Sequence, residues 1–281
     1  MSDTTNNSKL QRRLLYLFTR TPLHVGAGSS VGAIDQPIIR ERHTGFPVIP
    51  GTAIKGVLAD DAAYLANRKT GERTEKGRAL FGHEKPDDQN AKSGSVSFGE
   101  GKLLAFPVRS GKGCFAWLTC PLIIERWQRE AHDDLGDLVV PNGSDAYFDA
   151  DTLGSPKAIL EDYAFSHKAP FAAAAKLAGV VSDAVWRELA AKHLVLVSND
   201  VLAHFVRTAC EVAQHVRIDD ESGTAADGAL FNQENVPAET LFYASLTELR
   251  PTAFDGFAVP PVLQIGGDAT TGLGFCTAQL V

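Results

Sequence analysis

Closely spaced cysteines are missing from this chain of 281 residues, which holds four, none of them in a Cys-x-x-Cys spacing. Zinc knuckles require such pairs, and disulfide frameworks require a small domain dense in cysteine, so the sequence argues against both. All four lie in otherwise apolar stretches, which predicts reduced thiols in the core of a cytoplasmic protein: Cys114, Cys120, Cys210 and Cys276.

Long apolar runs are missing too. One of the longest, residues 169–181, is rich in alanine and interrupted by Lys176 and Gly179, whereas a membrane-spanning helix needs about 20 apolar residues. Residues 1–11 are polar and lack the apolar segment of a secretory signal, so they are predicted to form a disordered tail. We therefore expect no membrane span, no membrane partner and no signal peptide.

Standard metal and phosphate motifs are also absent. The eight histidines form neither a His-x-x-x-His nor a His-Glu-x-x-His pattern, so no preformed metal cage is predicted. Residues 26–32 have the wrong glycine spacing for a dinucleotide-binding loop, and residues 51–56 lack the Gly-Lys-Ser/Thr of a P-loop.

Positive charge is in short supply, because 34 acidic against 27 basic residues give a net charge of −7. That balance argues mildly against a polyanionic partner. It does not exclude an RNA groove, which needs only local N–H donors and a few arginines. A hydrophobic share of 44% and a charged share of 22% suffice for the core of one elaborated domain or two small ones.

Apolar runs predict strands at residues 12–21, 95–108, 114–122, 194–198, 241–249, 261–265 and 275–281. Helical spacing predicts helices from Thr52 to the glycine at 71, at 123–131 and at 182–193. A further helix is predicted to begin at a cap formed by Asn199 or Asp200 and to run through residue 207. Residues 211–218 and 228–231 bracket a polar turn at 219–227 and predict an extended hairpin, while residues 134–156 read as a loop or weakly ordered insertion. This order indicates an α+β fold.

Two glycine-rich segments each follow a predicted strand. We name residues 24–28 the first glycine loop and residues 266–274 the second glycine loop. Glycine lets backbone N–H groups approach a phosphate closely, so both loops are candidate anion nests. The alternative, which is preferable for either loop alone, is that the glycines only permit tight turns.

A single acid, Asp35, lies among apolar residues between the first glycine loop and a basic stretch. Beside a phosphodiester, its carboxylate could bind a divalent metal or orient a 2′-hydroxyl, while Arg40, Arg42 and Lys55 hold the backbone. The alternatives are an Asx turn at Asp35 and a solvated loop or a Glu41 salt bridge for the arginines. His24 is a candidate proton shuttle or a plain surface histidine.

Three motifs carry a family resemblance: the first glycine loop with residues 32–38 and 43–56, the stretch 229–243, and the second glycine loop. In this order they resemble the RAMP superfamily, collinearly from about residue 14 to the last residue. Residues 229–243 are similar to the thumb of the backbone (fourth) subunit family of type III-B CRISPR (Cmr) effector complexes. Residues 84–91 and 134–156 match nothing in the family, and residues 268–270 are a loose version of its loop.

The resemblance implies an RNA-recognition-motif-like, ferredoxin-like core with loop insertions and a protruding β-hairpin thumb at about residues 200–245, within a single domain at 12–281. It implies head-to-tail polymerisation along a guide CRISPR RNA, contact with other Cmr subunits, and cleavage of the paired target RNA at regular intervals. The family would then be a metal-dependent endoribonuclease of antiviral defence. A non-catalytic structural filament subunit and a stand-alone guide-processing nuclease are the alternatives.

The resemblance also implies site residues. Asp35 would be catalytic and would bind the divalent metal, Mg²⁺ or Mn²⁺, with His24 and Glu234 in supporting catalytic positions. The residues expected to bind RNA are Gly26, Gly28, Arg40, Arg42, Lys55, Gly266, Gly267, Gly272 and Gly274.

Overall fold

A computed structural model describes residues 10–28, 32–84, 91–136, 138–216, 218, 224 and 230–281. Residues 1–9 of the predicted tail, residues 85–90 of the unmatched segment and most of the polar turn at 219–227 lie outside these ranges. The division into a tail at 1–11 and one domain at 12–281 stays a prediction, although the Gln11 N–H donates to Glu248 Oε2 at 3.0 Å.

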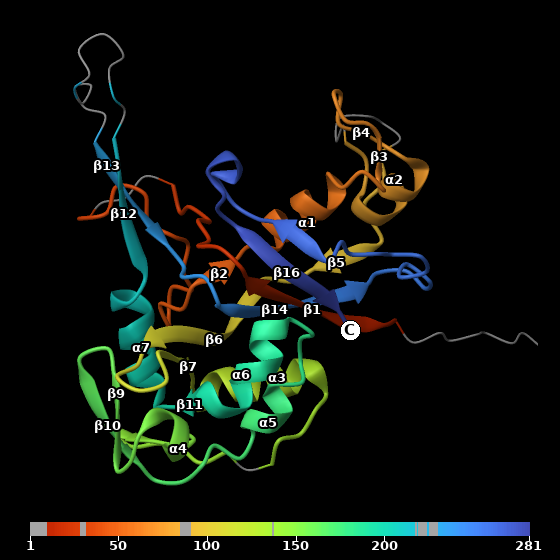
Figure 1. Cartoon of the computed structure of the whole chain (residues 1–281). Helices are drawn as coiled ribbons and strands as arrows, with labels where there is room; N and C mark the ends of the chain where they lie inside the picture. Colours follow the sequence, from red (N-terminus) through yellow and green to blue (C-terminus); the bar gives the residue numbers. More distant parts are fainter. Residues whose placement is uncertain are drawn as a thin grey trace, which may run out of the picture.

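A nine-stranded sheet forms the body of the molecule (Figure 1). Its main path runs in the order β11 (Leu194–Leu196), β7 (Phe115–Thr119), β6 (Gly101–Arg109), β14 (Leu241–Glu248), β1 (Arg12–Thr19), β16 (Phe275–Leu280) and β15 (Val262–Gln264). Off this path, β2 (Val48–Ile49) pairs with β6 and β5 (Val96–Phe98) with β14. Both neighbours of β1 come from the C-terminal part of the chain, so the two ends of the sequence share one sheet.

Strand β1 is buried on both faces, which explains its continuous apolar run. On one face, Tyr16 OH accepts a hydrogen bond from Trp127 Nε1 of α3 (Pro121–Ala131) at 2.9 Å. On the same face, Phe18 lies edge-on to Trp186 of α6 (Ala184–His193), with 5.8 Å between ring centroids. Trp117 of β7 contacts both rings, so α3 and α6 cover this face through aromatic packing.

The predicted helix at 52–71 is too long. Helix α1 spans Gly51–Ala59, follows Pro50 without a side-chain cap, and is not capped by Thr52. The chain turns because Asp61 Oδ1 accepts the Ala63 N–H at 2.9 Å. Leu65, which matches the helical spacing, lies in β3 (Leu65–Asn67), a short strand paired with β4 (Glu72–Arg73) before α2 (Glu75–Phe81).

The unmatched segment at 134–156 is more ordered than predicted. It contains β8 (Asp145–Ala146) and α4 (Ala150–Leu153), and β8 pairs with β10 (Tyr163–His167), which pairs with β9 (Lys157–Leu160). The short helix α5 (Ala174–Leu177) follows. Helix α7 (Asn199–Thr208) is capped by the Ser198 hydroxyl, one residue before the predicted cap, because Asn199 Oδ1 accepts the Leu122 N–H instead.

A two-stranded hairpin of β12 (Glu211–His215) and β13 (Phe231–Asn235) follows α7 and extends away from the central sheet (Figure 1). We call these two strands the thumb hairpin. Strand alternation places Asn232 and Glu234 on one face of β13 and Gln233 on the other. The α+β fold with a protruding hairpin is therefore confirmed.

The cysteines are free thiols, but they are not all in the core. Cys120 and Cys276 are buried, and burial raises the pKa of each thiol to about 12. Cys210 is half-buried. Cys114 is exposed, against the prediction, because it lies with a φ of 73° in the turn between β6 and β7. Within the part of the chain described, no helix combines the length and hydrophobicity needed to cross a membrane.

Replacing Trp117 by alanine is predicted to lower the free energy of unfolding by about 3–5 kcal/mol, because its fully buried ring contacts Phe18 and Trp186. Val262→Ala, at a side chain 37% exposed, serves as the control and should cost less than about 0.5 kcal/mol. Denaturant titration of both variants measures this difference, and equal costs would contradict the described core.

Candidate functional site

The structure brings the two glycine loops together. The Gly267 N–H donates to the His24 carbonyl at 3.0 Å, and the Gly274 N–H donates to the Pro22 carbonyl at 2.8 Å. The approach requires glycine, since a Cβ on Gly266 would stand 2.1 Å from the His24 carbonyl oxygen, and the φ of Gly266 is 83°. The two loops thus form one continuous surface.

His24 is buried under this junction, which excludes the alternative of a surface histidine. Its Nδ1 lies 2.8 Å from the carbonyl oxygen of Glu234, and because a carbonyl only accepts, Nδ1 carries the proton. In the neutral ring, Nε2 then keeps its lone pair, beneath Gly26 and without a hydrogen-bond partner among the described residues. This arrangement suits a proton acceptor.

Asp35 is exposed, and the loop that carries it packs against strand β13 of the thumb hairpin. Its side chain bonds to this strand and does not form a local Asx turn. Its Oδ2 accepts the Asn232 N–H at 2.8 Å, and its own N–H donates to Asn232 Oδ1 at 2.7 Å. The Asn232 Nδ2 also donates to the Ala33 carbonyl at 3.1 Å. Asn232 therefore clamps the Asp35 loop onto β13, while Asp35 Oδ1 has no partner in the described ranges.

Glu234 fixes the other end of the same loop. Its Oε1 forms an ion pair with Arg40 Nη2, and its Oε2 accepts the Ile38 N–H at 3.1 Å, with the two ion-pair side chains only 6% and 19% exposed. Arg40 also donates to the carbonyls of Gly45 and Val206. The Arg40 guanidinium is thus engaged within the protein, and its contact with RNA stays a prediction. Glu41, the alternative partner expected from the sequence, pairs with Arg126 instead.

Gln233 joins the second glycine loop to the thumb hairpin. The family resemblance left open whether Gln233 or Glu234 occupies the supporting position, and only Glu234 was predicted as a site residue. Gln233 is buried, and its Nε2 donates to Asp268 Oδ2 at 2.9 Å. Asn232 and Gln233 both lie inside the 229–243 motif, but only the strand register shows that they point to opposite faces. Alternation along β13 is the signal that could have found them.

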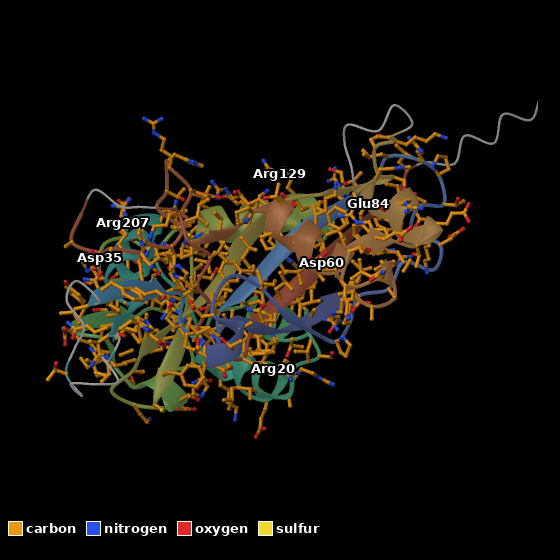
Figure 2. All side chains as sticks on the ribbon, turned by 90° about the horizontal axis from the view of Figure 1, so that it is seen from above. Arg20, Asp35, Asp60, Glu84, Arg129 and Arg207 are labelled. Carbon is orange, nitrogen blue, oxygen red and sulfur yellow. The ribbon has the colours of Figure 1, made fainter. Side chains whose placement is uncertain are left out.

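The remaining predicted RNA-binding residues are more loosely placed. Arg42 is exposed, Lys55 lies on α1, and neither forms an ion pair within the described part of the chain. Gly28 and Gly272 adopt φ values of 90° and 87° with open space where a Cβ would stand. Within the described ranges, no hydrogen bond or ion pair joins Arg42, Lys55 or Gly28 to His24, Asp35 or Glu234. In Figure 2, Asp35 lies at one end of the molecule, away from Asp60, which directly follows α1.

A model of the RAMP superfamily matches residues 17–277. The chain belongs to the RAMP superfamily. The "CRISPR system Cmr endoribonuclease Cmr4" of Pyrococcus furiosus is 36% identical over 289 residues, with 95% of each chain covered. A "CRISPR system Cms endoribonuclease Csm3" of Streptococcus thermophilus is 35% identical over 85 residues, which cover 28% of this chain and 38% of that protein.

Solved structures show the same RAMP fold. The crystal structure of oligomeric Cmr4 from Pyrococcus furiosus superposes with a TM-score of 0.72 at 27% identity, covering 97% of this chain and 98% of that one. The cryo-EM structure of the type III-B Cmr-beta bound to cognate target RNA gives a TM-score of 0.74 at 17% identity, covering 96% and 97%. At that identity the likeness concerns the fold alone.

Glu234→Ala is predicted to reduce the free energy of unfolding by about 3 kcal/mol, because it leaves the Arg40 guanidinium buried without its partner. The matched control is Glu72→Ala, which removes an exposed ion pair with Arg78 and should cost less than about 1 kcal/mol. Chemical denaturation compares the two, and similar losses would show that the buried pair does not brace the loop.

Gly266→Ala should destabilise this RAMP chain more than Gly28→Ala. Both substitutions place a Cβ at positive φ, at a cost of about 1–2 kcal/mol, but only Gly266→Ala also collides with the His24 carbonyl. Thermal unfolding of the two variants measures the difference. If Gly28→Ala lowers the midpoint as much, the two loops are not in contact as described.

Proposed function

We propose that this chain is a guide-RNA-binding backbone subunit of a type III-B CRISPR interference complex, working in the cytoplasm in antiviral defence. It polymerises head to tail along the guide CRISPR RNA, contacts other Cmr subunits and cleaves the paired target RNA at regular intervals. Supporting this are the 36% identity to a protein named a Cmr endoribonuclease and the likeness to an oligomeric Cmr4. The observation that carries it is the meeting of both glycine loops, His24 and the Asp35 loop at the thumb hairpin.

The geometry supports cleavage by the ribose 2′-hydroxyl adjacent to the scissile phosphate. His24 Nε2 is a proton acceptor whose ring is held by the Nδ1 bond to the Glu234 carbonyl. Asp35 Oδ1, on an exposed loop, has no partner among the described residues. In-line attack by an internal 2′-oxygen leaves a cyclic phosphate and a 5′-hydroxyl end. Glu234 is a positioning residue in this scheme, because both its oxygens are bonded to the loop that carries Asp35.

A divalent metal fits this site only together with RNA. Among the described residues no three histidine, cysteine or acidic side chains converge as a metal cage. Mg²⁺ commonly keeps several waters and is held by one or two carboxylates plus substrate phosphates, so Asp35 Oδ1 could supply the protein ligand. When bound there, the metal would polarise the scissile phosphate and stabilise its developing charge.

Guide binding rests on uncharged backbone donors rather than on net charge. Among the described residues, the N–H groups of Gly26, Gly28 and Gly266 have no hydrogen-bond partner and are the donors left for a phosphate, whereas those of Gly267, Gly272 and Gly274 bond to carbonyls of the protein. Arg42 and Lys55, which form no ion pair with a described residue, add positive charge. Base pairing between guide and target would select the sequence, while the protein contacts the backbone.

One observation favours a second candidate function, a structural filament subunit without catalysis. Asp35 makes two bonds to Asn232, so its carboxylate also shapes the loop. In that case the nuclease activity would belong to another subunit, and Asp35 would matter only for loop geometry.

Asp35→Asn is predicted to lower target cleavage by about 100-fold or more in the assembled complex while target binding is unchanged. Asparagine keeps an oxygen for the Asn232 N–H but loses the charge, so the loop is preserved. Asp35→Ala should also bind and fail to cut. Cleavage is measured by the appearance of cyclic-phosphate ends, with Mg²⁺ and with a chelator at equal binding.

Asn232→Ala separates the two candidate functions, because it removes the side-chain bonds to the Asp35 N–H and the Ala33 carbonyl and leaves the Asp35 carboxylate with its bond from the backbone N–H at position 232. Should Asp35→Asn cut normally while Asn232→Ala does not, Asp35 has a structural role and the second candidate is correct. If cleavage is undiminished in chelator, the reaction does not depend on a divalent metal. That result would leave the proposed role of His24 as proton acceptor unchanged.

A further inference from the structure

A cavity lies between helix α7 and the turn at His43 and Thr44, outside the site formed by the glycine loops and the thumb hairpin. It measures about 500 Å³ and opens between α7 and the turn that holds His43 and Thr44. Asn199, His204 and Arg207 line it from α7. Cavities of this size hold small ligands or single ligand groups in other proteins.

The cavity face of α7 is polar along two turns. Positions 199, 203 and 207 and positions 200, 204 and 208 follow the spacing of four that places residues on one side of a helix, and all line the cavity. The opposite side of α7, with Leu202, Phe205 and Val206, is buried in the core. The polar residues of this face are exposed, so the cavity is an open groove between α7 and the turn that holds His43 and Thr44.

Arg207 lines this cavity, is exposed, and has no counter-charge among the described residues. Its guanidinium lies over Gly45, where a Cβ would stand 2.6 Å from Nε, and its Nη2 reaches the Thr44 carbonyl at 3.3 Å. Arg40 and Arg126, at neighbouring positions in the fold, both pair with glutamates, whereas Arg207 has no ion pair with any described residue. A guanidinium that touches backbone on one side and has no acidic partner among the described residues is suited to binding an anion.

Asp200 lines the same cavity but does not neutralise Arg207. Seven residues separate the two along α7, which corresponds to about 10 Å. The cavity is therefore cationic at the Arg207 end, while the Asn199–Asp200 end carries an amide and a carboxylate, and His43 and His204 also line it. Such a gradient matches a group that is anionic at one end and polar at the other.

The cavity is physically joined to the Asp35 site. Arg40, the partner of Glu234, donates to the carbonyl of Gly45 at 2.9 Å and to that of Val206 at 2.7 Å, so one side chain holds both walls. Arg207 and Asp35 lie at the same end of the molecule, away from Arg129 (Figure 2). An RNA strand bound at Asp35 would therefore run at the end of the molecule where this cavity opens.

We propose that the cavity binds one nucleotide of an RNA strand, with Arg207 on its phosphate and the Asn199–Asp200 end toward its hydroxyl and base groups. This inference rests on the proposed function, since it takes RNA as the ligand. Guide and target strands share the phosphodiester chemistry, and the experiment below distinguishes them.

The test is the salt dependence of RNA binding by the assembled complex, loaded with guide alone or with guide and target. Losing one phosphate contact should reduce affinity roughly tenfold and make the slope of log affinity against log salt shallower by about 0.7. Arg207→Gln is the informative variant, because its amide can still bond the Thr44 carbonyl while the charge is lost, and Arg207→Lys should recover part of the slope.

The matched control is Arg129→Ala, which removes an equal charge at an exposed position away from Asp35 (Figure 2). If Arg207→Gln makes the slope of log affinity against log salt shallower for binding of the guide, the cavity binds a guide phosphate. If the slope changes only when target is added, the cavity binds a target phosphate. The same slope for Arg207→Gln and Arg129→Ala overturns the inference and leaves the proposed function intact. Absence of RNA binding by the unmodified complex overturns both.

Discussion

The ion pair between Arg40 and Glu234 is the contact on which the arrangement of the site depends. It is largely withdrawn from solvent, and such a pair is retained only when the remaining donors and acceptors are satisfied. Here the Ile38 N–H and the carbonyls of Gly45 and Val206 satisfy them. One side chain thus links the Asp35 loop, the thumb hairpin and α7.

The candidate site combines uncharged backbone N–H groups of the glycine loops with side chains that are held by the thumb hairpin. The net charge of −7 would suggest a partner other than RNA, yet the glycine loops offer N–H donors that carry no formal charge. His24 is held by the carbonyl of Glu234, and Asp35 by Asn232, so both catalytic candidates take their position from β13. The thumb hairpin is accordingly part of the site as well as an extension from the body.

Much of the fold could be predicted from local pattern, because buried strands such as β1 and β14 have apolar runs, and a polar stretch of sequence separates the two strands of the thumb hairpin. The end of α1 could not, since Leu65 fits the helical spacing and only the Asp61 turn stops the helix. Asp35 and the glycine loops stood out as motifs. The partner of Arg40 did not, because Glu234 is 194 positions away and Glu41 is adjacent.

The most direct measurement is a structure of the assembled complex with a non-cleavable target RNA. The account predicts Asp35 Oδ1 within about 3 Å of the reacting 2′-oxygen, or joined to the scissile phosphate through one metal ion at about 2.1 Å from the carboxylate. An Asp35 carboxylate that contacts only Asn232, with the scissile phosphate beyond the reach of one bridging ion or water, would contradict it.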